Sequence, residues 1–277
     1  MSGRTDADDV WRKRYGPWAV VTGASDGIGE AIARDLAARG LHLVLVARRA
    51  NRLQHVADAC RQQFGVDVRV LPVDLAARPA VRSLLDATAD IDVGLLVAAA
   101  GFGTSGRFLD LDEVDELGMV EVNCHAVLAM TKAFAARLAA RGHGGIVLFS
   151  SLLAFQGVPK SANYAATKAY IQTLAEGLHA ELKTVGVDVL SCAPGPVKTG
   201  FATRSNMQMG MATTPEIVAR DTLAALGTAS TVRPGLLSKV LIWSLATLPR
   251  KARTAIMGAI MAGMTKHQDE AQAAAEV

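Results

Sequence analysis

The sequence predicts an α/β domain in which a doubly wound parallel sheet lies between two layers of helices. Short apolar runs alternate with helical stretches, and the run at residues 41–47 is continuously apolar. Such a run is typical of a parallel strand that is buried on both faces. The alternation implies right-handed β-α-β crossovers and a three-layer α/β/α arrangement. At 277 residues, 51% of them hydrophobic, the chain is long enough for one large domain.

The elements follow one another along the chain in this alternating pattern. Gly40 ends the first helix of the domain and Gly65 ends the second. We expect strands at residues 18–22, 41–47, 66–73, 93–99, 146–150 and 187–192. We expect helices at residues 28–39, 51–64, 79–89, 117–140 and 162–185.

The two ends of the chain differ from this pattern. Residues 1–16 are polar, lack the features of a signal peptide, and are expected to form a flexible extension. Residues 231–277 are apolar and basic, and we expect a helical C-terminal extension there. The uncharged stretch at residues 142–159 is broken by glycines and serines, so a buried strand and loop is favoured over a membrane helix.

Charge and cysteine content narrow the function classes. A net charge of +3 and the lack of a basic segment with interleaved aromatics argue against nucleic acid as a partner. The three cysteines are far apart and form no C-x-x-C pair, which favours a reducing, cytoplasmic setting. The histidines show no spacing typical of a metal site, and none is predicted.

A glycine-rich turn, T-G-A-S-D-G-I-G, runs from Thr22 to Gly29 after the first predicted strand. Glycines let the backbone approach a pyrophosphate, whose charge is stabilised by the free N–H groups at a helix N-terminus. An ordinary strand-to-helix turn is the alternative, but the position in a β-α-β unit favours a Rossmann-type dinucleotide site. No Lys-Ser or Lys-Thr follows the last glycine, which argues against a P-loop.

The end of the second predicted strand bears on the choice of cofactor. Arg48 and Arg49 stand there, and no Asp or Glu occurs between Asp35 and Asp58. A guanidinium suits a ribose 2′-phosphate as a charge and as a planar donor. NADP(H) is therefore favoured, with NAD(H) as the alternative and a solvated arginine pair as the non-functional interpretation.

Tyr164 and Lys168 lie one helical turn apart, and Ser151 ends an apolar run thirteen positions before Tyr164. Most Y-x-x-x-K pairs are ordinary helix-surface pairs. Here Ser151 should reach the carboxyl edge of the sheet, where open α/β folds bind ligands. We expect the ammonium to lower the tyrosine pKa, so that the phenol transfers a proton while Ser151 stabilises the substrate oxygen.

Together these residues resemble the short-chain dehydrogenase/reductase family over about residues 17 to 200. Asp74-Leu75, Asn123 and Pro194-Gly195 followed by Thr199 complete the resemblance. It implies that Asp74 contacts the adenine, that Asn123 supports a proton path to Lys168, and that Thr199 lies near the nicotinamide. The catalytic set is then Ser151, Tyr164, Lys168 and Asn123. The expected cofactor-binding residues are Thr22, Gly23, Ser25, Asp26, Gly27, Ile28, Gly29, Arg48, Arg49, Asp74, Leu75, Ala100, Gly101, Tyr164, Lys168, Pro194, Gly195, Val197 and Thr199.

The chain departs from the family pattern in two places. Residues 98–101 read Ala-Ala-Ala-Gly where the family usually has Asn-Asn-Ala-Gly, which removes a hydrogen-bonded brace of the sheet. The chain also continues through residues 231–277, where many members stop. Within the family it looks most like bacterial DltE-like reductases, which are related to ketoacyl and hydroxysteroid reductases.

The C-terminal extension has two interpretations. No Asp or Glu occurs from residue 222 to 268, whereas six Lys and Arg do, and the apolar runs at 236–248 and 256–264 are too short to span a bilayer. The extension can form amphipathic helices that contact an anionic membrane surface or guide an anionic lipid-like substrate. The favoured alternative is a helical flap that packs on the core or on a partner subunit. Met207, Met209 and Met211 suggest a lid over an apolar substrate, or else a disordered connector.

The sequence as a whole predicts an NADP(H)-dependent oxidoreductase whose catalytic, Rossmann-type domain covers residues 17–230. We expect it to interconvert a small lipophilic ketone or aldehyde with an alcohol. A homodimer or homotetramer is expected from the alanine-rich helix at residues 131–140 and from the family resemblance. The alternatives are a cofactor-binding regulatory protein, or a lipid-binding protein at the membrane surface, on the same fold.

Overall fold

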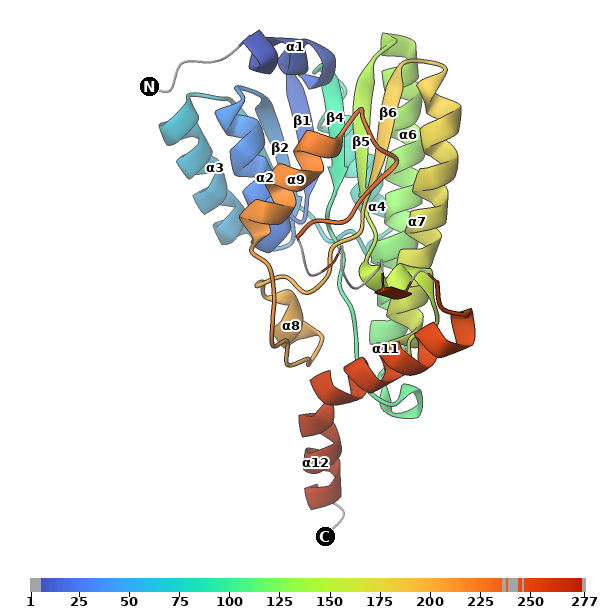
Figure 1. The fold of residues 1–277 in the computed structure, drawn as a ribbon. Coiled ribbons are helices and arrows are strands. Elements are labelled where there is room, and N and C mark those ends of the chain that lie inside the picture. Colours follow the sequence, from blue (N-terminus) through green and yellow to red (C-terminus); the bar gives the residue numbers. More distant parts are fainter. Residues whose placement is uncertain (1–5, 236–237, 239–243, 246, 276–277) are drawn as a thin grey trace.

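A computed structural model of the protein describes residues 6–235, 238, 244–245 and 247–275 (Figure 1). Most of the apolar run expected at 236–248 therefore lies outside the described residues. Among the described residues, no helix combines the length and the apolarity that crossing a bilayer requires.

Seven parallel strands form one sheet in the order β3-β2-β1-β4-β5-β6-β7. The strands are β1 Trp18–Thr22, β2 His42–Ala47, β3 Val68–Pro72, β4 Val93–Ala98, β5 Gly144–Phe149, β6 Val187–Cys192 and β7 Thr231–Val232. The order of strands reverses between β1 and β4, which makes the sheet doubly wound, as predicted. Because β7 begins at Thr231, the sheet extends two residues beyond the expected domain boundary at residue 230.

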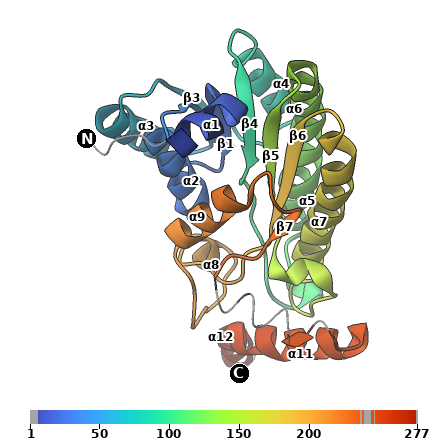
Figure 2. The same cartoon turned by 45° about the horizontal axis from the view of Figure 1, so that its top comes forward.

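Helices cover both faces of the sheet (Figures 1 and 2). The helices are α1 Asp6–Tyr15, α2 Gly27–Ala38, α3 Ala50–Phe64, α4 Pro79–Asp86, α5 Glu113–Val120, α6 Val127–Arg141, α7 Ala162–Lys183, α8 Phe201–Arg204, α9 Pro215–Ala225, α11 Arg250–Met264 and α12 Lys266–Ala275. Within β1, Ala19 and Val21 pack with α2, α3 and α9, whereas Val20 packs with α4, α6 and α7. Side chains of the strand thus point alternately into the cores on the two faces of the sheet, which explains why the strands are continuously apolar.

The single helix expected at residues 117–140 is interrupted in the structure. Residues Glu121–Ala126 form a π-helical turn, η2, between α5 and α6. Asn123 lies in this turn, and its side chain is hydrogen-bonded to the backbone of Phe102. Turns of this kind occur often at functional sites, and the apolar periodicity of a sequence does not indicate them.

The expected flexible extension at residues 1–16 is wrong for residues 6–15, which form helix α1. Tyr15 is only 2% exposed, and its hydroxyl donates to Asp188 Oδ2 at 2.7 Å. Arg14 Nε donates to the same oxygen at 2.6 Å. A Cβ added at Gly145 would lie 3.0 Å from the Tyr15 ring, so the ring packs where a strand residue lacks a side chain. The helix is held by this burial and by the shared carboxylate.

Replacing Tyr15 with Phe tests this anchoring. The variant keeps the buried ring but leaves the Asp188 carboxylate with one donor fewer, so we expect the free energy of unfolding to fall by about 1–3 kcal/mol. Urea unfolding monitored by circular dichroism measures it. Tyr170→Phe is the matched control, because Tyr170 is 40% exposed. Equal stability of the Tyr15→Phe variant and the control would contradict the docking of α1.

Candidate active site

The predicted site residues come together at the carboxyl edge of the sheet. Strands β1, β4, β5 and β6 are parallel neighbours, so the segments that follow them share one edge. Thr22, at the end of β1, accepts a hydrogen bond from the N–H of Ala100 at 3.0 Å. This bond joins the glycine turn to the segment after β4. In that segment, alanines at positions 98 and 99 replace the two asparagines that usually brace the sheet in the family. Thr22 therefore supplies part of a bracing contact there.

The glycine turn has the backbone that a phosphate-binding turn needs. Gly23 and Gly27 have φ angles of 69° and 57°, which disfavour residues with a side chain. Helix α2 begins at Gly27, and its N-cap Asp26 makes no side-chain capping bond. A Cβ at Gly29 would lie 2.3 Å from the Gly23 carbonyl oxygen, so only glycine fits this tight turn. The uncapped N–H groups of Ile28 and its neighbours suit a pyrophosphate.

Two arginines border the glycine turn. Arg49 Nη2 donates to Ser25 Oγ at 3.1 Å and lies 3.4 Å from Asp26 Oδ2. Arg52 Nη1 lies 3.4 Å from the same carboxylate oxygen. Arg52 was not predicted, although its place in the first turn of α3, three residues after Arg49, puts it on the same side of the turn.

Arg48 and Asp74 lie opposite each other across the β2–β3 edge. Arg48 Nη1 is 3.9 Å from Asp74 Oδ2, and both side chains are about half exposed. Asp74 Oδ1 accepts from the N–H of Ala76 at 3.1 Å, which shapes the turn after β3, while Leu75 is buried. The cationic groups at the end of β2 thus remain accessible to an anion.

Ser151, Tyr164 and Lys168 meet beside the end of β5. Ser151 caps the short helix η3 Leu152–Phe155, and its Oγ accepts from the N–H of Leu153 at 3.2 Å. Tyr164 and Lys168 are 8% and 6% exposed and lie in the first two turns of α7. Lys168 Nζ donates to the Phe149 carbonyl oxygen at 2.8 Å and lies 5.7 Å from the centre of the Tyr164 ring.

In the protein without cofactor, burial is the main influence on the pKa values of Tyr164 and Lys168. Burial raises the pKa of Tyr164 to about 12, although a hydrogen bond with Ser151 lowers it in part. Burial also lowers the pKa of Lys168 to about 8, against smaller opposing effects of Cys124 and Cys192. The expectation that the ammonium lowers the tyrosine pKa is therefore wrong for the protein alone. The Lys168 ammonium points to the Phe149 carbonyl. For Tyr164, the loss of hydration on burial therefore raises the pKa more than a nearby positive charge lowers it.

Asn123 holds the segment after β4 against this pair. Its Nδ2 donates to the Phe102 carbonyl at 2.8 Å and to Thr167 Oγ1 at 3.1 Å, while its Oδ1 accepts from the Phe102 N–H at 3.1 Å. A Cβ at Gly101 would lie 2.9 Å from Asn123 Oδ1 and 3.3 Å from Lys168 Nζ. Gly101 thus leaves room for Asn123 and Lys168 to lie close together.

The segment after β6 closes the site from the opposite side. Pro194, Gly195, Val197 and Thr199 all line a cavity that also contacts Ile28, Ser151 and Tyr164. A Cβ at Gly27 would lie 2.7 Å from Thr199 Cγ2, so this segment touches the glycine turn. The residues expected to bind phosphate, nicotinamide and substrate therefore share one continuous site.

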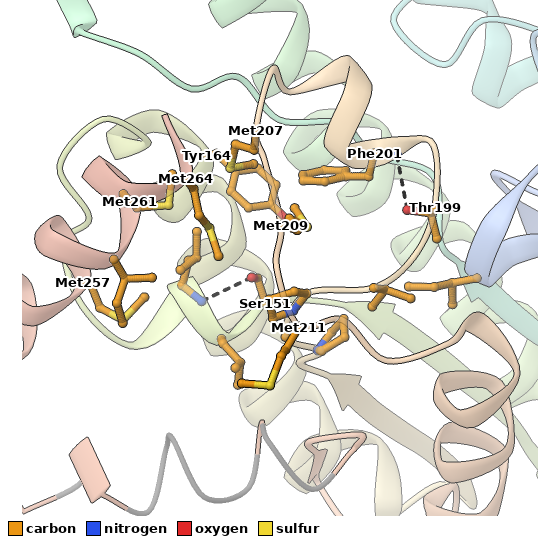
Figure 3. A pocket seen from close by; sticks show the side chains of 18 residues that line it. Ser151, Tyr164, Thr199, Phe201, Met207, Met209, Met211, Met257, Met261 and Met264 are labelled. Atoms are coloured by element: carbon orange, nitrogen blue, oxygen red, sulfur yellow. Dashed lines mark hydrogen bonds between the residues drawn. The ribbon is translucent and has the colours of Figure 1, made fainter. Parts of the chain in front are cut away.

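The cavity has a volume of about 380 Å³, and none of its described lining residues is charged (Figure 3). This size falls in the range of small-molecule sites. Six of the nine methionines of the chain line it: Met207, Met209, Met211, Met257, Met261 and Met264. We refer to it as the methionine cavity.

Met207, Met209 and Met211, which suggested a lid or a disordered connector, line the cavity, and helix α11 contributes the other three methionines. Sequence reasoning missed the role of α11, although Met257, Met261 and Met264 have the i, i+4, i+7 spacing of one helix face. It also missed Phe201, whose ring centre lies 5.4 Å from that of Tyr164.

No group of three or more His, Cys, Asp or Glu side chains in the described part of the chain is placed to hold a metal ion.

Comparison with known proteins identifies the family. A family model described as short chain dehydrogenase matches residues 17–210. The chain belongs to the short-chain dehydrogenase family. The 7beta-hydroxysteroid dehydrogenase of Clostridium sardiniense is 32% identical over 233 residues, which are 83% of this chain and 89% of that enzyme. A very-long-chain 3-oxoacyl-CoA reductase-like protein of Arabidopsis thaliana is 33% identical over 231 residues, which are 80% and 74% of the two chains.

Solved structures of short-chain dehydrogenases match the whole domain. A 7beta-hydroxysteroid dehydrogenase superposes with a TM-score of 0.83 at 26% identity and covers 89% of this chain and 98% of its own. A short-chain dehydrogenase from Sphingobium yanoikuyae in complex with NADPH gives 0.76 at 26% identity, with coverage of 85% and 97%. The predicted family and the sheet with helices on both faces are confirmed. The protein is an oxidoreductase of alcohols and carbonyls that uses a nicotinamide cofactor.

Replacing Lys168 with Met tests the burial of the ammonium. The folded pKa of about 8 lies below the unfolded value of 10.5, so between these pH values the unfolded chain binds a proton that the folded protein does not. In the cofactor-free protein, wild type should gain stability relative to Lys168→Met by about 1.4 kcal/mol per pH unit in this window, and the difference should be constant below it. Urea unfolding of both proteins from pH 7 to 10 measures this. A difference that does not change with pH would contradict the burial.

Proposed function

We propose that the protein is an NADP(H)-dependent oxidoreductase that interconverts a lipophilic ketone or aldehyde with its alcohol. The observation that carries the proposal is the position of Tyr164 and Ser151 in the wall of the methionine cavity. Their hydroxyls and that of Thr199 are the polar side-chain groups among the described lining residues, and the other lining side chains are apolar. An apolar substrate with one carbonyl or alcohol group matches this distribution.

The residues of the site divide the proton chemistry between them. In the reductive direction, the Tyr164 hydroxyl donates its proton to the carbonyl oxygen as that oxygen gains negative charge. A raised pKa keeps Tyr164 protonated at neutral pH, which suits this direction. Ser151 Oγ donates a hydrogen bond to the same oxygen. Bound NADPH supplies the hydride in this chemistry. In the oxidative direction Tyr164 accepts the proton of the alcohol.

Lys168 and Asn123 support Tyr164 in this proposal. The ammonium of Lys168 can donate to the ribose next to the nicotinamide, because its only bond to another described residue is the one to Phe149. Asn123 positions Phe102 and lies close to Gly101 and Lys168. We assign Asn123 to the relay that replenishes the proton of Lys168 and Tyr164.

The preference for NADP(H) over NAD(H) rests on the arginines beside the glycine turn. Arg48, Arg49 and Arg52 are about half exposed, and in the described part of the chain Arg48 pairs with Asp74 whereas Arg49 and Arg52 both pair with Asp26. A ribose 2′-phosphate would compensate the remaining positive charge. A related short-chain dehydrogenase from Sphingobium yanoikuyae was solved with NADPH, which supports the same preference.

A bulky apolar substrate is supported by the cavity and by the relatives. Methionine side chains are flexible and adapt to irregular apolar shapes. One named relative is a hydroxysteroid dehydrogenase and the other is a very-long-chain 3-oxoacyl-CoA reductase-like protein, and both steroids and very long acyl chains are large and lipophilic. The expected placement among DltE-like reductases stays a prediction.

The C-terminal extension is assigned to the substrate site. Met257 and Met261 of α11 are buried against Val158, Ala165 and Met207. This packing supports a flap on the core, and peripheral membrane contact through residues 231–277 stays an alternative prediction. The expected homo-oligomer is assigned to the exposed apolar side chains Leu117, Val120, Leu128 and Tyr170 on neighbouring helices.

Replacing Tyr164 with Phe tests the proton transfer. The ring is retained, so NADPH affinity should stay within about twofold, whereas kcat for ketone reduction should fall by about 10² or more, since general acid catalysis contributes on that scale. NADPH absorbance and fluorescence titration measure the two quantities. Tyr170→Phe is the control for loss of a phenol outside the site. Unchanged turnover in Tyr164→Phe would refute the assignment.

Replacing Arg48 with Asp tests the cofactor preference. The new carboxylate would repel a 2′-phosphate and can accept from a free ribose hydroxyl, so the ratio of the NADPH and NADH dissociation constants should shift towards NADH by about tenfold or more. Arg82→Asp is the control, because Arg82 is exposed on α4 and pairs with Asp86. An unaltered ratio in Arg48→Asp means that the phosphate binds elsewhere.

A further inference from the structure

Helix α11 lies across the carboxyl end of the sheet (Figures 1 and 2). Four of its residues, three of them methionines, line the methionine cavity. Its first turn contains Arg250, Lys251 and Arg253 and no acidic residue. Cations are unfavourable at this end of a helix, because the helix dipole is positive there. The N-cap Pro249 offers no side-chain bond to offset it.

Two arginines near this end carry buried nitrogens without partners. The Nε atoms of Arg233 and Arg253 are buried and have no hydrogen-bond partner in the described part of the chain. Around α11 the described salt bridges join Lys160 to Asp269 and Lys266 to Glu270, beyond its other end. A buried guanidinium donor without an acceptor is costly, so an anion that accepts from it would be stabilising.

Both arginines lie next to the walls of the methionine cavity. Arg253 precedes Met257 by four residues and Met264 by eleven, so it continues the helix face that lines the cavity. Arg233 follows β7 and its guanidinium lies 5.0 Å from the centre of the Phe155 ring, in the short helix whose Leu152 and Leu153 line the cavity. A Cβ added at Gly157, two residues beyond Phe155, would lie 3.8 Å from Thr254 Oγ1. The loop at residues 155–157 therefore lies beside Arg233 and beside Thr254, the residue that follows Arg253.

We propose that Arg233 and Arg253 bind the anionic end of an amphiphilic substrate whose carbonyl reacts at Tyr164. The inference rests on the proposed function and adds a substrate class: a lipophilic ketone that carries a carboxylate or another oxyanion. The apolar body occupies the methionine cavity, which holds no charge of its own. Arg253 and Met264 lie about 16 Å apart along the axis of α11, and Met257 and Met261 line the cavity between them.

Two matched ketones test the anion site. 9-Oxodecanoate and decan-2-one have the same methyl ketone and the same chain, except that a carboxylate replaces the terminal methyl group of the neutral compound. Wild type should reduce the acid with a kcat/KM about tenfold or more above that of the neutral ketone, mainly through KM. In Arg253→Met and Arg233→Met this ratio should fall towards one. Methionine keeps an apolar stem in place of the arginine stem.

Arg250→Met is the matched control, since Arg250 is an exposed arginine of the same turn and should leave the ratio as in wild type. A ratio near one in wild type, or a ratio that Arg253→Met and Arg233→Met leave unchanged, overturns the inference while the reductase activity stands. Failure of wild type to oxidise NADPH with either ketone counts against the proposed function instead.

Binding without turnover gives an independent readout. Calorimetric titration of the NADPH-loaded protein with decanoate and with decan-1-ol, neither of which NADPH can reduce, should show tighter binding of the carboxylate, and Arg253→Met should remove the difference. Equal binding of both compounds to wild type overturns the inference. A lipid headgroup is another source of an oxyanion, and sedimentation with phosphatidylglycerol vesicles tests it. If Arg253→Met abolishes vesicle binding but alters neither the kcat/KM ratio of the two ketones nor the affinity for decanoate, the arginines bind a lipid surface and the inference is wrong.

Discussion

The buried ammonium of Lys168 is the constraint on which the rest of the site depends. A desolvated cation is stable only where hydrogen-bond acceptors are held in place, and here the Phe149 carbonyl provides one. Phe149 ends β5, so this bond sets the distance between α7 and the sheet. Ser151 follows two residues later, and Tyr164 lies one turn before Lys168 on the helix. The proton-transfer groups are thus placed by one strand end and one helix.

Glycines in the segment after β4 leave space for these site residues. Gly101 leaves space beside Lys168 and Asn123, and Gly103 does so beside Tyr164 and Phe201. These contacts seal one side of the phenol, whereas its other side faces the methionine cavity (Figure 3). A substrate oxygen therefore has polar partners at one end of an otherwise apolar space. In the proposed function, the residues at the sheet edge carry out the chemistry, whereas α11 and the loop before α9 select the substrate.

Much of this arrangement could be predicted from the sequence, because it depends on local signals. Continuous apolar strands, glycines at helix ends and the Tyr164–Lys168 spacing identify the sheet, its edge and the pair that meets there. What could not be predicted depends on long-range packing. Tyr15 is held by Asp188, which lies far away along the chain, and no local pattern of residues 1–16 indicates this bond. The pKa of Tyr164 was misjudged because spacing shows the neighbouring charge but not the depth of burial.

The measurement that tests the account most directly is a crystal structure of the protein with NADP⁺ and a long-chain secondary alcohol. We predict the alcohol oxygen within hydrogen-bonding distance of both Tyr164 Oη and Ser151 Oγ, with its apolar chain beneath α11. An alcohol bound with its oxygen away from these two hydroxyls, or outside the methionine cavity, would contradict the account.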